Sequence, residues 1–264
     1  MDPTPDEILE RTQWDFFWLP EDAEVCDRPE ILYARCERDV PYLNAVTRTR
    51  APAARLPALV REVDAAHAAD LSRWQVPSTI ETAPLEAALE AGGYAPAYEN
   101  IAHVVEVDAY RVRASSGILT RPVDSLDRLR DCTSVSERAF GQSLEHTESE
   151  LRDDLARCTE PGARVHRCVA YDESTGQPLA SGGMSLFPEL GFGLLWAGGT
   201  VPEARGRGAY SAVVAARVTR ARELGFRMVG LYARVGNSAP IVARQGFSRC
   251  GRMVCWERPS PRVP

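Results

Sequence analysis

Residues 192–224 constrain the fold most, because they read as a strand, a glycine turn and the start of a helix in succession. An apolar run rich in aromatic and β-branched residues covers 192–201, and from Tyr210 onward apolar residues recur at helical spacing. Gly206 and Gly208 lie at the junction, where glycine lets the backbone turn with its N–H groups directed into one concavity. The helix that follows adds the positive end of its dipole, so the junction predicts an anion-binding site.

Residues 205–210 also carry a family motif. Arg205-Gly-Arg-Gly-Ala-Tyr210 resembles the Arg/Gln-x-x-Gly-x-Gly/Ala loop of the GCN5-related N-acetyltransferases, the GNAT superfamily. In that family the loop holds the pyrophosphate of acetyl-coenzyme A. Arg205 and Gly208 fall on the motif, whereas Tyr210 stands where the family usually has Gly or Ala. This departure concerns the packing at the start of the helix and leaves the turn itself intact.

The segment downstream supplies the context of this loop. A second apolar run at 228–233 is followed by a turn, a short helix at 240–245 and then Gly246-Phe247. Asn237 and Gly246-Phe247 resemble the Asn and Gly-Phe landmarks of the GNAT family. Together with the glycine loop, the resemblance covers residues 117–257 and implies a GNAT fold for that part of the chain.

The first part of the chain repeats this order of elements. The expected elements are a strand at 42–48, an amphipathic helix at 53–69, a strand at 71–76, a helix at 84–92, Gly92-Gly93-Tyr94 in the place of Gly246-Phe247, and a closing strand at 103–107. Residues 47–54 replace the glycine loop, and Pro52 removes a donor, so no phosphate cradle can form there. The first half therefore resembles a degenerate GNAT domain, with two unrelated α/β segments as the alternative.

The sequence thus predicts an α/β (α+β) protein of two GNAT-like domains, each a mixed central β-sheet flanked by helices. We expect a degenerate N-terminal domain at 1–112, an acetyltransferase domain at 117–257 and a disordered proline-rich tail at 258–264. A polar segment at 108–116 is the expected linker. The second domain should open with a strand at 117–123, helices around 125–140 and 147–158, and strands at 164–171 and 179–187 joined by a hairpin turn at 172–176.

Composition and charge exclude several kinds of function. All 31 basic residues are Arg, so no Schiff-base lysine and no phosphate-loop Gly-Lys-Ser/Thr site can exist. The formal charge of −6 opposes a general nucleic-acid binder, whose phosphate contacts need a basic face. No apolar run approaches ~18 residues and the N-terminus is acidic, so we expect a cytoplasmic protein without a membrane segment.

The cysteines and histidines predict neither disulfides nor a metal site. The seven cysteines are odd in number and scattered, which suits free thiols in a reducing compartment. The four histidines include no pair at ligand spacing. His166 and Cys168 alternate along an expected strand and would face one side, but nothing supplies the orienting third group that a nucleophile and its base need. We interpret them as neighbours on a strand face.

The GNAT resemblance implies a set of residues that bind acetyl-coenzyme A, the co-substrate. In that family the strands matching 196–201 and 228–233 splay apart, and the pantetheine arm lies between them. The coenzyme-binding residues implied are Gly198, Gly199 and Thr200 for the pantetheine, Arg205, Gly206, Arg207, Gly208, Ala209, Tyr210 and Ser211 for the pyrophosphate, and Asn237. For Arg207 an ordinary solvated surface charge is an equal alternative.

The reaction implied is direct attack of a neutral amine on the acetyl thioester, with a backbone N–H of the central strand stabilising the oxyanion. The family often places a carboxylate base on this strand, but 192–201 has none. The remaining candidates for the base are Glu145, Glu148 and Glu189. The thiolate-protonating Tyr of the family falls on Val242 or Arg244, neither of which donates a proton as Tyr does. Tyr232 or water is left as the catalytic acid.

We therefore expect an enzyme, a GNAT-type N-acetyltransferase that moves the acetyl group from acetyl-coenzyme A to a primary amine of a small molecule. The alternatives are an acyltransferase for a longer acyl group or a protein amine, and a catalytically weak module that binds coenzyme A or a partner. The missing Tyr favours the weak module, whereas the intact loop favours the enzyme. The sequence leaves the amine acceptor and the formation of a homodimer open.

Overall fold

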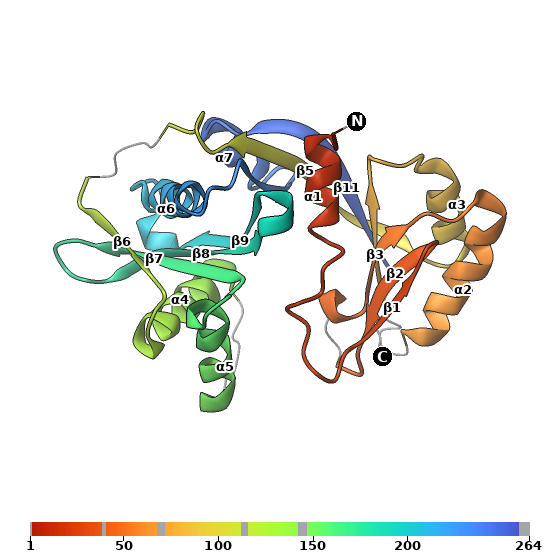
Figure 1. Cartoon of the computed structure of the whole chain (residues 1–264), viewed down its shortest axis with the longest axis horizontal. Helices are drawn as coiled ribbons and strands as arrows, with labels where there is room; N and C mark the ends of the chain where they lie inside the picture. Colours follow the sequence, from red (N-terminus) through yellow and green to blue (C-terminus); the bar gives the residue numbers. More distant parts are fainter. Residues whose placement is uncertain (1, 39–40, 68–71, 112–115, 142–146, 259–264) are drawn as a thin grey trace. The chain divides into compact units, whose positions relative to one another are not determined.

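The computed structural model describes residues 2–38, 41–67, 72–111, 116–141 and 147–258 of the chain. Its contacts divide the chain into two compact units. The first unit comprises Met1–His103, Tyr232–Ala243 and Arg249–Pro264, and the second comprises Val104–Leu231 and Arg244–Ser248. The units therefore alternate along the sequence, as the colours of Figure 1 let the reader follow.

The first unit combines helices with a mixed sheet. Its elements are α1 (Pro5–Arg11), β1 (Glu24–Arg28), β2 (Ile31–Arg35), β3 (Ala45–Thr49), α2 (Leu56–Ala66), β4 (Arg73–Pro77), α3 (Ala83–Ala91) and, in large part, β5 (Ala95–Glu106), α7 (Ala239–Arg244) and β11 (Ser248–Glu257). Short 3-10 turns at Pro41–Leu43 and Ala53–Arg55 precede β3 and α2. β1, β2 and β3 pair antiparallel in succession, and β3 pairs parallel with β4.

An amphipathic helix and two tryptophans organise the core of this unit. Leu59 and Val63 of α2 are fully buried, which agrees with the predicted amphipathic helix, and so is Trp74 of β4. Trp256 of β11 belongs to the same apolar cluster and lies opposite Trp74 in the antiparallel β4–β11 pair. Trp256 thus makes β11 part of this core. Burying one large apolar side chain contributes roughly 1.5–3 kcal/mol to the free energy of unfolding.

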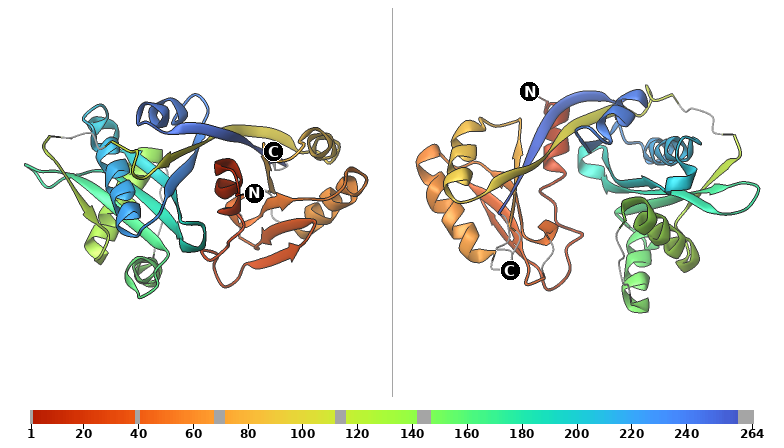
Figure 2. Two further views of the ribbon diagram at one scale, coloured as in Figure 1. Left: turned by 45° about the horizontal axis from the view of Figure 1, so that its top comes forward. Right: turned by 180° about the vertical axis from the view of Figure 1, so that it is seen from behind.

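The second unit is built on four antiparallel strands followed by one parallel strand. Its elements are β6 (Ile118–Pro122), α4 (Leu126–Phe140), α5 (Glu148–Thr159), β7 (Val165–Asp172), β8 (Pro178–Phe187), β9 (Phe192–Thr200), α6 (Ala209–Glu223) and the first part of β10 (Met228–Arg234). β6 to β9 pair antiparallel in succession, and β9 pairs parallel with β10. Helices α4 and α6 cover opposite faces of this sheet (Figure 2), since Gly199 faces α4 and Gly198 faces α6.

The strand pairing of the first unit recurs in the second. In both β1–β4 and β7–β10, two antiparallel pairs are followed by a parallel pair, and a helix, α2 or α6, connects the parallel strands. Gly93 follows α3, the next helix after β4, and Gly246 follows α7, the next helix after β10, with φ angles of 83° and 92°. Tyr94 and Phe247 after them are buried. The predicted mixed sheet flanked by helices and its internal repeat are confirmed.

The structure departs from the sequence-based expectations in two places. No element was predicted for α1 or for the β1–β2 hairpin. The strand β11 pairs with β4 of the first unit, whereas the predicted second domain ran without interruption from 117 to 257. A local pattern identifies a strand but not its partner, because pairing depends on contacts between distant segments. The predicted disorder of the tail concerns residues 259–264, which lie outside the described residues.

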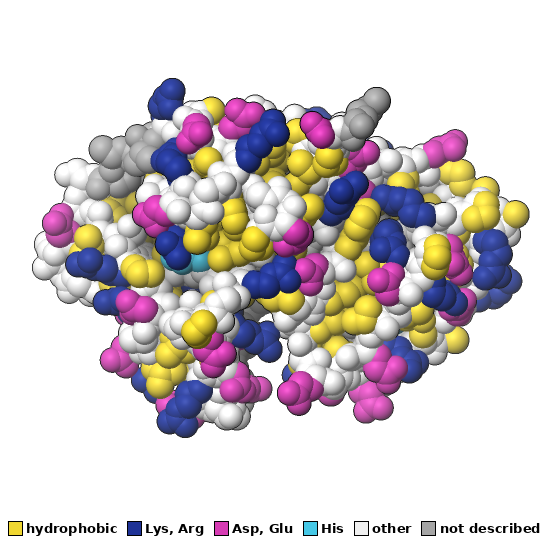
Figure 3. Space-filling view, viewed as in Figure 1, with side chains coloured by type: hydrophobic (Ala, Val, Ile, Leu, Met, Phe, Trp, Pro, Cys, Tyr) yellow, Lys and Arg dark blue, Asp and Glu magenta, His cyan; other side chains and the backbone are white. Residues whose placement is uncertain are grey.

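The described surface carries charges of both signs. On the face shown in Figure 3, basic and acidic side chains are interspersed, with hydrophobic side chains between them. This face therefore shows no block of a single sign among the side chains that the structure describes. No helix within the described ranges is long and apolar enough to cross a bilayer.

Candidate functional site

A β-bulge interrupts the central strand β9. The register of β9 against β8 shifts between Ser181 and Gly183, so that Ala197 and Gly198 together oppose a single residue of β8. Ala197 has a φ of 46°, and it is the only non-glycine residue with positive φ in the described part of the chain. The bulge therefore releases backbone groups of Ala197 and Gly198 from the hydrogen-bond ladder.

The parallel pair β9–β10 is short. It joins Phe192–Leu194 to Met228–Gly230, and among the described residues the pairing goes no further along β9. The pairing thus ends before the bulge begins, at the place where the family resemblance implies splayed strands. Unpaired strand backbone is a template for hydrogen bonding, so an extended ligand can add to this edge of β9.

A glycine turn leads from β9 into α6. After a 3-10 turn at Pro202–Ala204, Gly206 and Gly208 have φ angles of 80° and 89°, which glycine adopts without strain. The first hydrogen bond within α6 runs from Ala212 N to Gly208 O at 3.0 Å. The N–H groups of residues 209–211 precede this bond and have no acceptor within the helix. They are therefore candidate donors for an anion at the positive end of α6.

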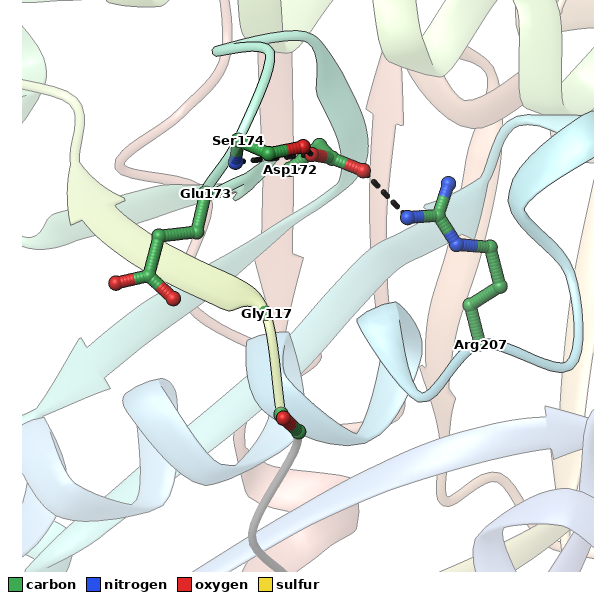
Figure 4. Close-up of a pocket in the computed structure, with 6 residues that line it drawn as sticks. Gly117, Asp172, Glu173, Ser174 and Arg207 are labelled. Carbon is green, nitrogen blue, oxygen red and sulfur yellow. Dashed lines mark hydrogen bonds and ion pairs between the residues drawn. The ribbon is translucent and has the colours of Figure 1, made fainter.

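The two arginines of this turn differ in their partners. Arg207 pairs with Asp172 at the end of β7, and Figure 4 shows this pair beside Ser174 in an open pocket. Hydrogen bonds from Ser174 and the charge of Arg207 hold the pKa of Asp172 below its ordinary value. Arg205 is exposed and forms no ion pair with any residue that the structure describes. Arg205 is therefore the better candidate for phosphate, because the charge of Arg207 is partly neutralised.

Two side chains of α6 lie against Gly198. A methyl group built on Gly198 would lie 3.0 Å from the ring of Tyr210 and 3.3 Å from Nη2 of Arg217. Arg217 is 1% exposed and donates hydrogen bonds to three backbone oxygens. Sequence reasoning missed Arg217, although it follows Val213 by four residues and so shares the buried face of the helix. Tyr210 fits at the helix start because Gly198 has no side chain.

Several polar atoms of this unit are buried without a hydrogen bond among the described residues, and two of them belong to Thr200 and Gln245. These two are the hydroxyl of Thr200, at the end of β9, and Oε1 of Gln245. The amide of Gln245 is fixed by its Nε2, which donates to Oγ of Ser211 in α6 at 2.7 Å. Buried polar atoms usually have partners, so both atoms fit a ligand that brings amide and hydroxyl groups. No sequence motif indicated Gln245.

The face of β9 opposite α6 carries an aromatic side chain with a charged pair. Trp196 donates from Nε1 to Oγ of Ser185 at 3.0 Å, and the guanidinium of Arg167 lies over its ring, 5.2 Å from the centroid. Arg167 also donates to Asp154 of α5 at 3.1 Å, and its Nε is buried without a hydrogen bond among the described residues. Trp196 directly precedes the bulge, so these side chains are candidates for recognising the acceptor.

The carboxylates predicted as candidate bases are surface charges where the structure describes them. Glu148 is exposed and lies 2.9 Å from Arg130, and Glu189 is exposed and lies 3.9 Å from Arg164. Glu145 lies outside the described residues. Nothing in these contacts distinguishes either described glutamate from an ordinary solvated ion pair.

Tyr232, Asn237 and Val242 belong to the first unit and are described within it. The hydroxyl of Tyr232 is buried without a hydrogen bond among the described residues, and burial, together with Asp6 and Glu10, raises its pKa well above its ordinary value. Asn237 is exposed in a turn. Val242 is 2% exposed, so its position is packed. The roles predicted for Tyr232 and Asn237 stay predictions.

His166 and Cys168 face the same side of β7. The Sγ of Cys168 lies 3.8 Å from the backbone oxygen of Val213 in α6, and the charge of Arg220 in the same helix acts on His166. Burial lowers the pKa of His166 to about 4 and raises that of Cys168 to about 11. These shifts disfavour the thiolate–imidazolium ion pair, which agrees with the interpretation of the two residues as neighbours on a strand face. All seven cysteines are free thiols.

Solved structures of GCN5-related N-acetyltransferases resemble this chain over 89–100% of its length. One from Kribbella flavida is 16% identical, covers 100% of this chain and 98% of its own, and has a TM-score of 0.74. A tandem GNAT protein from the clavulanic acid biosynthesis pathway is 15% identical, covers 97% of this chain and 89% of its own, and has a TM-score of 0.61. A GCN5-related N-acetyltransferase from Sphaerobacter thermophilus is 19% identical, covers 89% of this chain and 75% of its own, and has a TM-score of 0.61.

No family model and no curated protein matched the sequence of this chain. The likeness is therefore one of structure, at identities of 15–19% among the three. It agrees with the repeated strand pairing, the bulge in β9 and the glycine turn into α6. The fold predicted from the sequence is confirmed: this chain has the fold of the GCN5-related N-acetyltransferases, in its tandem form.

Proposed function

We propose that this chain is an acyl-coenzyme A-dependent N-acyltransferase that moves an acetyl group to a primary amine of a small molecule. The observation that carries the proposal is the backbone of residues 192–212, with a bulge in β9, no pairing to β10 beyond Leu194 and a glycine turn into α6. Each of these features presents backbone groups that the regular ladder and helix do not use. A long ligand with amides and a phosphate end matches this series of donors.

The coenzyme is a substrate of this reaction and not a resident cofactor. We propose that Arg205 and the N–H groups of residues 209–211 bind its pyrophosphate, and that the backbone of β9 from Gly198 to Thr200 binds its pantetheine amides. The unpaired hydroxyl of Thr200 and the unpaired amide oxygen of Gln245 support this assignment. The bound thioester supplies an acyl carbon that is activated toward a nitrogen nucleophile.

The bulge and the opposite face of β9 would perform the remaining chemistry. The N–H groups that the bulge releases would donate to the thioester oxygen as negative charge develops on it. One such fixed donor is worth roughly 10²–10³-fold in rate, about 2.7–4 kcal/mol. The amine must be neutral to attack. We propose that Asp154, held by Arg167 beside Trp196, takes the proton of the ammonium through water.

A coenzyme-binding module with little turnover is the second candidate. The observation that favours it concerns the two residues that match the family's Tyr, since Val242 is buried and apolar and Arg244 does not donate a proton as Tyr does. Transfer of a longer acyl group, or transfer to a protein amine, is a variant of the enzyme hypothesis that the same backbone site allows. The free thiols suit the cytoplasm, where we place either activity.

Calorimetry with acetyl-coenzyme A tests the binding site. Gly208→Val puts a β-branched side chain at a φ of 89°, and we expect coenzyme affinity to fall more than tenfold, about 1.4 kcal/mol. Gly225→Val is the matched control, because Gly225 has a φ of 73° beyond the opposite end of α6. The control carries a similar backbone strain and should bind as the parent does.

A folded Gly208→Val protein that binds as tightly as the parent would contradict the pyrophosphate assignment. A thiol-release assay with a panel of primary amines and several acyl-coenzymes then separates the two candidates. Release that depends on an amine supports the enzyme. Tight binding without release for any amine supports the module.

A further inference from the structure

Tyr210 occupies the position of α6 at which this chain departs from the family loop, and its side chain reaches the bulge. A methyl group built on Gly198 would lie 3.0 Å from the ring of Tyr210 and 3.6 Å from its hydroxyl. The first distance is closer than ordinary van der Waals contact, so the ring rests on the bare backbone of Gly198. The phenol is thus fixed beside a backbone segment that the bulge has released from the ladder.

Arg217 lies at the same glycine and carries a buried positive charge. Its Nη2 is 3.3 Å from the methyl position built on Gly198. Its Nη1 donates to the backbone oxygens of Gly183 at 2.9 Å and Trp196 at 3.3 Å, so it holds both strands beside the bulge. Its Nε donates to the oxygen of Val213 at 3.2 Å.

The charge of Arg217 has no carboxylate partner among the described residues, since all of its hydrogen bonds there end on backbone carbonyls. Glycine makes the room for it, because a methyl group on Gly182 would lie 2.8 Å from its Cζ. A buried cation without a counter-ion is costly unless something else compensates it. A negative charge that develops at the bulge during a reaction would provide that compensation.

The hydroxyl of Tyr210 is available as a donor. It makes no hydrogen bond to any residue that the structure describes, whereas the hydroxyls of Tyr94 and Tyr171 donate to Ser72 and Asp131. Burial raises the pKa of Tyr210 above its ordinary value, and the charge of Arg217 opposes that rise. The phenol therefore carries its proton at neutral pH, and the phenolate would form beside a cation.

We propose that Tyr210 is the catalytic acid that gives its proton to the coenzyme sulfur, in place of the Tyr that is missing at Val242. The inference rests on the proposed acyltransferase function. As the carbon–sulfur bond breaks, its electron pair stays on sulfur, and the Tyr210 proton moves to that sulfur. The acyl carbon keeps its new bond to the amine nitrogen. The phenolate regains a proton from solvent, which received the proton that the amine lost.

The rival donor, Tyr232, lies in different surroundings. Its hydroxyl belongs to the first unit, where the carboxylates of Asp6 and Glu10 disfavour a phenolate and raise its pKa. The charges that act on its pKa belong to carboxylates and thiols, which do not stabilise the anion that proton donation leaves behind. Of the two tyrosines, Tyr210 is the one whose phenolate the charge of Arg217 would stabilise.

Tyr210→Phe tests the proposal, because it keeps the ring on Gly198 and removes only the hydroxyl. The first readout needs no amine: the pKa of the thiol of bound coenzyme A, followed by the ultraviolet absorbance of the thiolate during a pH titration. A donor to the thiolate lowers that pKa, so we expect it to be higher in Tyr210→Phe, by about one unit, a tenfold change in thiolate fraction. Tyr171→Phe, whose hydroxyl meets Asp131, is the matched control and should behave as the parent.

The second readout is turnover in the thiol-release assay. We expect kcat to fall roughly 100-fold in Tyr210→Phe, at the lower end of general acid catalysis because a thiolate is a fair leaving group, with KM for the acyl-coenzyme nearly unchanged. Tyr232→Phe separates the rival, since the same loss of kcat in that variant, with none in Tyr210→Phe, would assign the acid to Tyr232.

The outcomes separate the two proposals. A parent protein that does not bind coenzyme A overturns both of them. Binding with the same thiol pKa in the parent and in Tyr210→Phe overturns the role of Tyr210 and leaves the proposed function standing. If Tyr210→Phe loses affinity equally for coenzyme A and for desulfo-coenzyme A, which lacks the sulfur, then Tyr210 serves packing and the inference is wrong.

Discussion

His67 shows at the scale of one residue how burial fixes a protonation state. Its side chain is fully buried, with Nδ1 2.7 Å from Oγ of Ser72 and Nε2 2.9 Å from the backbone oxygen of Ala34. Nε2 must carry the proton to donate to that carbonyl, so we assign Nδ1 as the acceptor from Ser72. Tyr94 donates in turn to Ser72 at 2.8 Å. Burial lowers the pKa of His67 to about 4.

Acid should therefore destabilise the first unit through His67. The unfolded chain binds a proton at the ordinary pKa of ~6.5, while the folded chain does so only near its lowered value, so the stabilisation is complete above the unfolded pKa and is lost as pH falls from ~6.5 toward ~4. At pH ~5 the loss is about 2 kcal/mol. Urea unfolding of the parent and of His67→Gln measures it. Equal pH slopes in the two proteins over this window would contradict the assignment.

At the scale of one element, β9 requires glycine for close packing on both faces. Gly198 admits the ring of Tyr210 on the α6 side. On the α4 side, a methyl group on Gly199 would lie 2.8 Å from Cβ of Ala139 and 3.2 Å from the ring of Phe140. The two glycines thus let one strand approach two helices, while the bulge between the paired and unpaired parts frees backbone for a ligand.

Gly199→Ala should destabilise the second unit, because the new methyl group overlaps Ala139 and neither backbone can yield easily. Overpacking of this kind costs about 1–3 kcal/mol. Chemical denaturation followed by circular dichroism measures it. Ala197→Gly is the matched change in the same strand, which adds no atom and relieves a φ of 46°, so it should not destabilise. A Gly199→Ala protein as stable as the parent would show that α4 shifts freely on this sheet.

At the scale of the whole molecule, each compact unit is made of stretches that are separated in the sequence. The last strand, β11, pairs with β4 from residue Met253 opposite Pro77 to Glu257 opposite Arg73. The side chains of Arg73 and Glu257 meet there at 2.6 Å, a contact between residues 184 positions apart. Completion of the first unit therefore requires β11, which lies far from β4 in the sequence, and contacts of such long range slow folding because the loop must close first.

Trp256→Ala tests this dependence. Its side chain is 8% exposed within the apolar cluster of the first unit, and truncating such a residue leaves a cavity, so we expect a loss of about 3–5 kcal/mol. Trp18→Ala, at a partly exposed loop residue of the same unit, is the control and should cost less. Differential scanning calorimetry of both variants gives the comparison. Equal losses would mean that Trp256 contributes no more to this core than a partly exposed loop side chain does.

Local pattern determined the elements that surround the site. The apolar spacing of α2, the strand β9 and the turn at Gly206 and Gly208 all follow from interactions within a few residues, and each is found as predicted. The hairpin turn after β7 has the same origin. Sequence spacing sufficed here because turns, caps and helical faces are decided by neighbouring residues.

Tertiary structure decided which residues meet at the site. Nothing in the local sequence pairs Arg207 with Asp172, brings Gln245 to Ser211 or seats Tyr210 on Gly198, because each contact joins segments that only the folded sheet brings together. The pairing of β11 with β4 likewise depends on the folded sheet. The sequence by itself determined the glycine turn and the strand before it. Only the fold determined that Arg217 is buried beneath the bulge. The strand backbones that accept its hydrogen bonds are positioned by the register of the sheet, and spacing along the chain does not set that register.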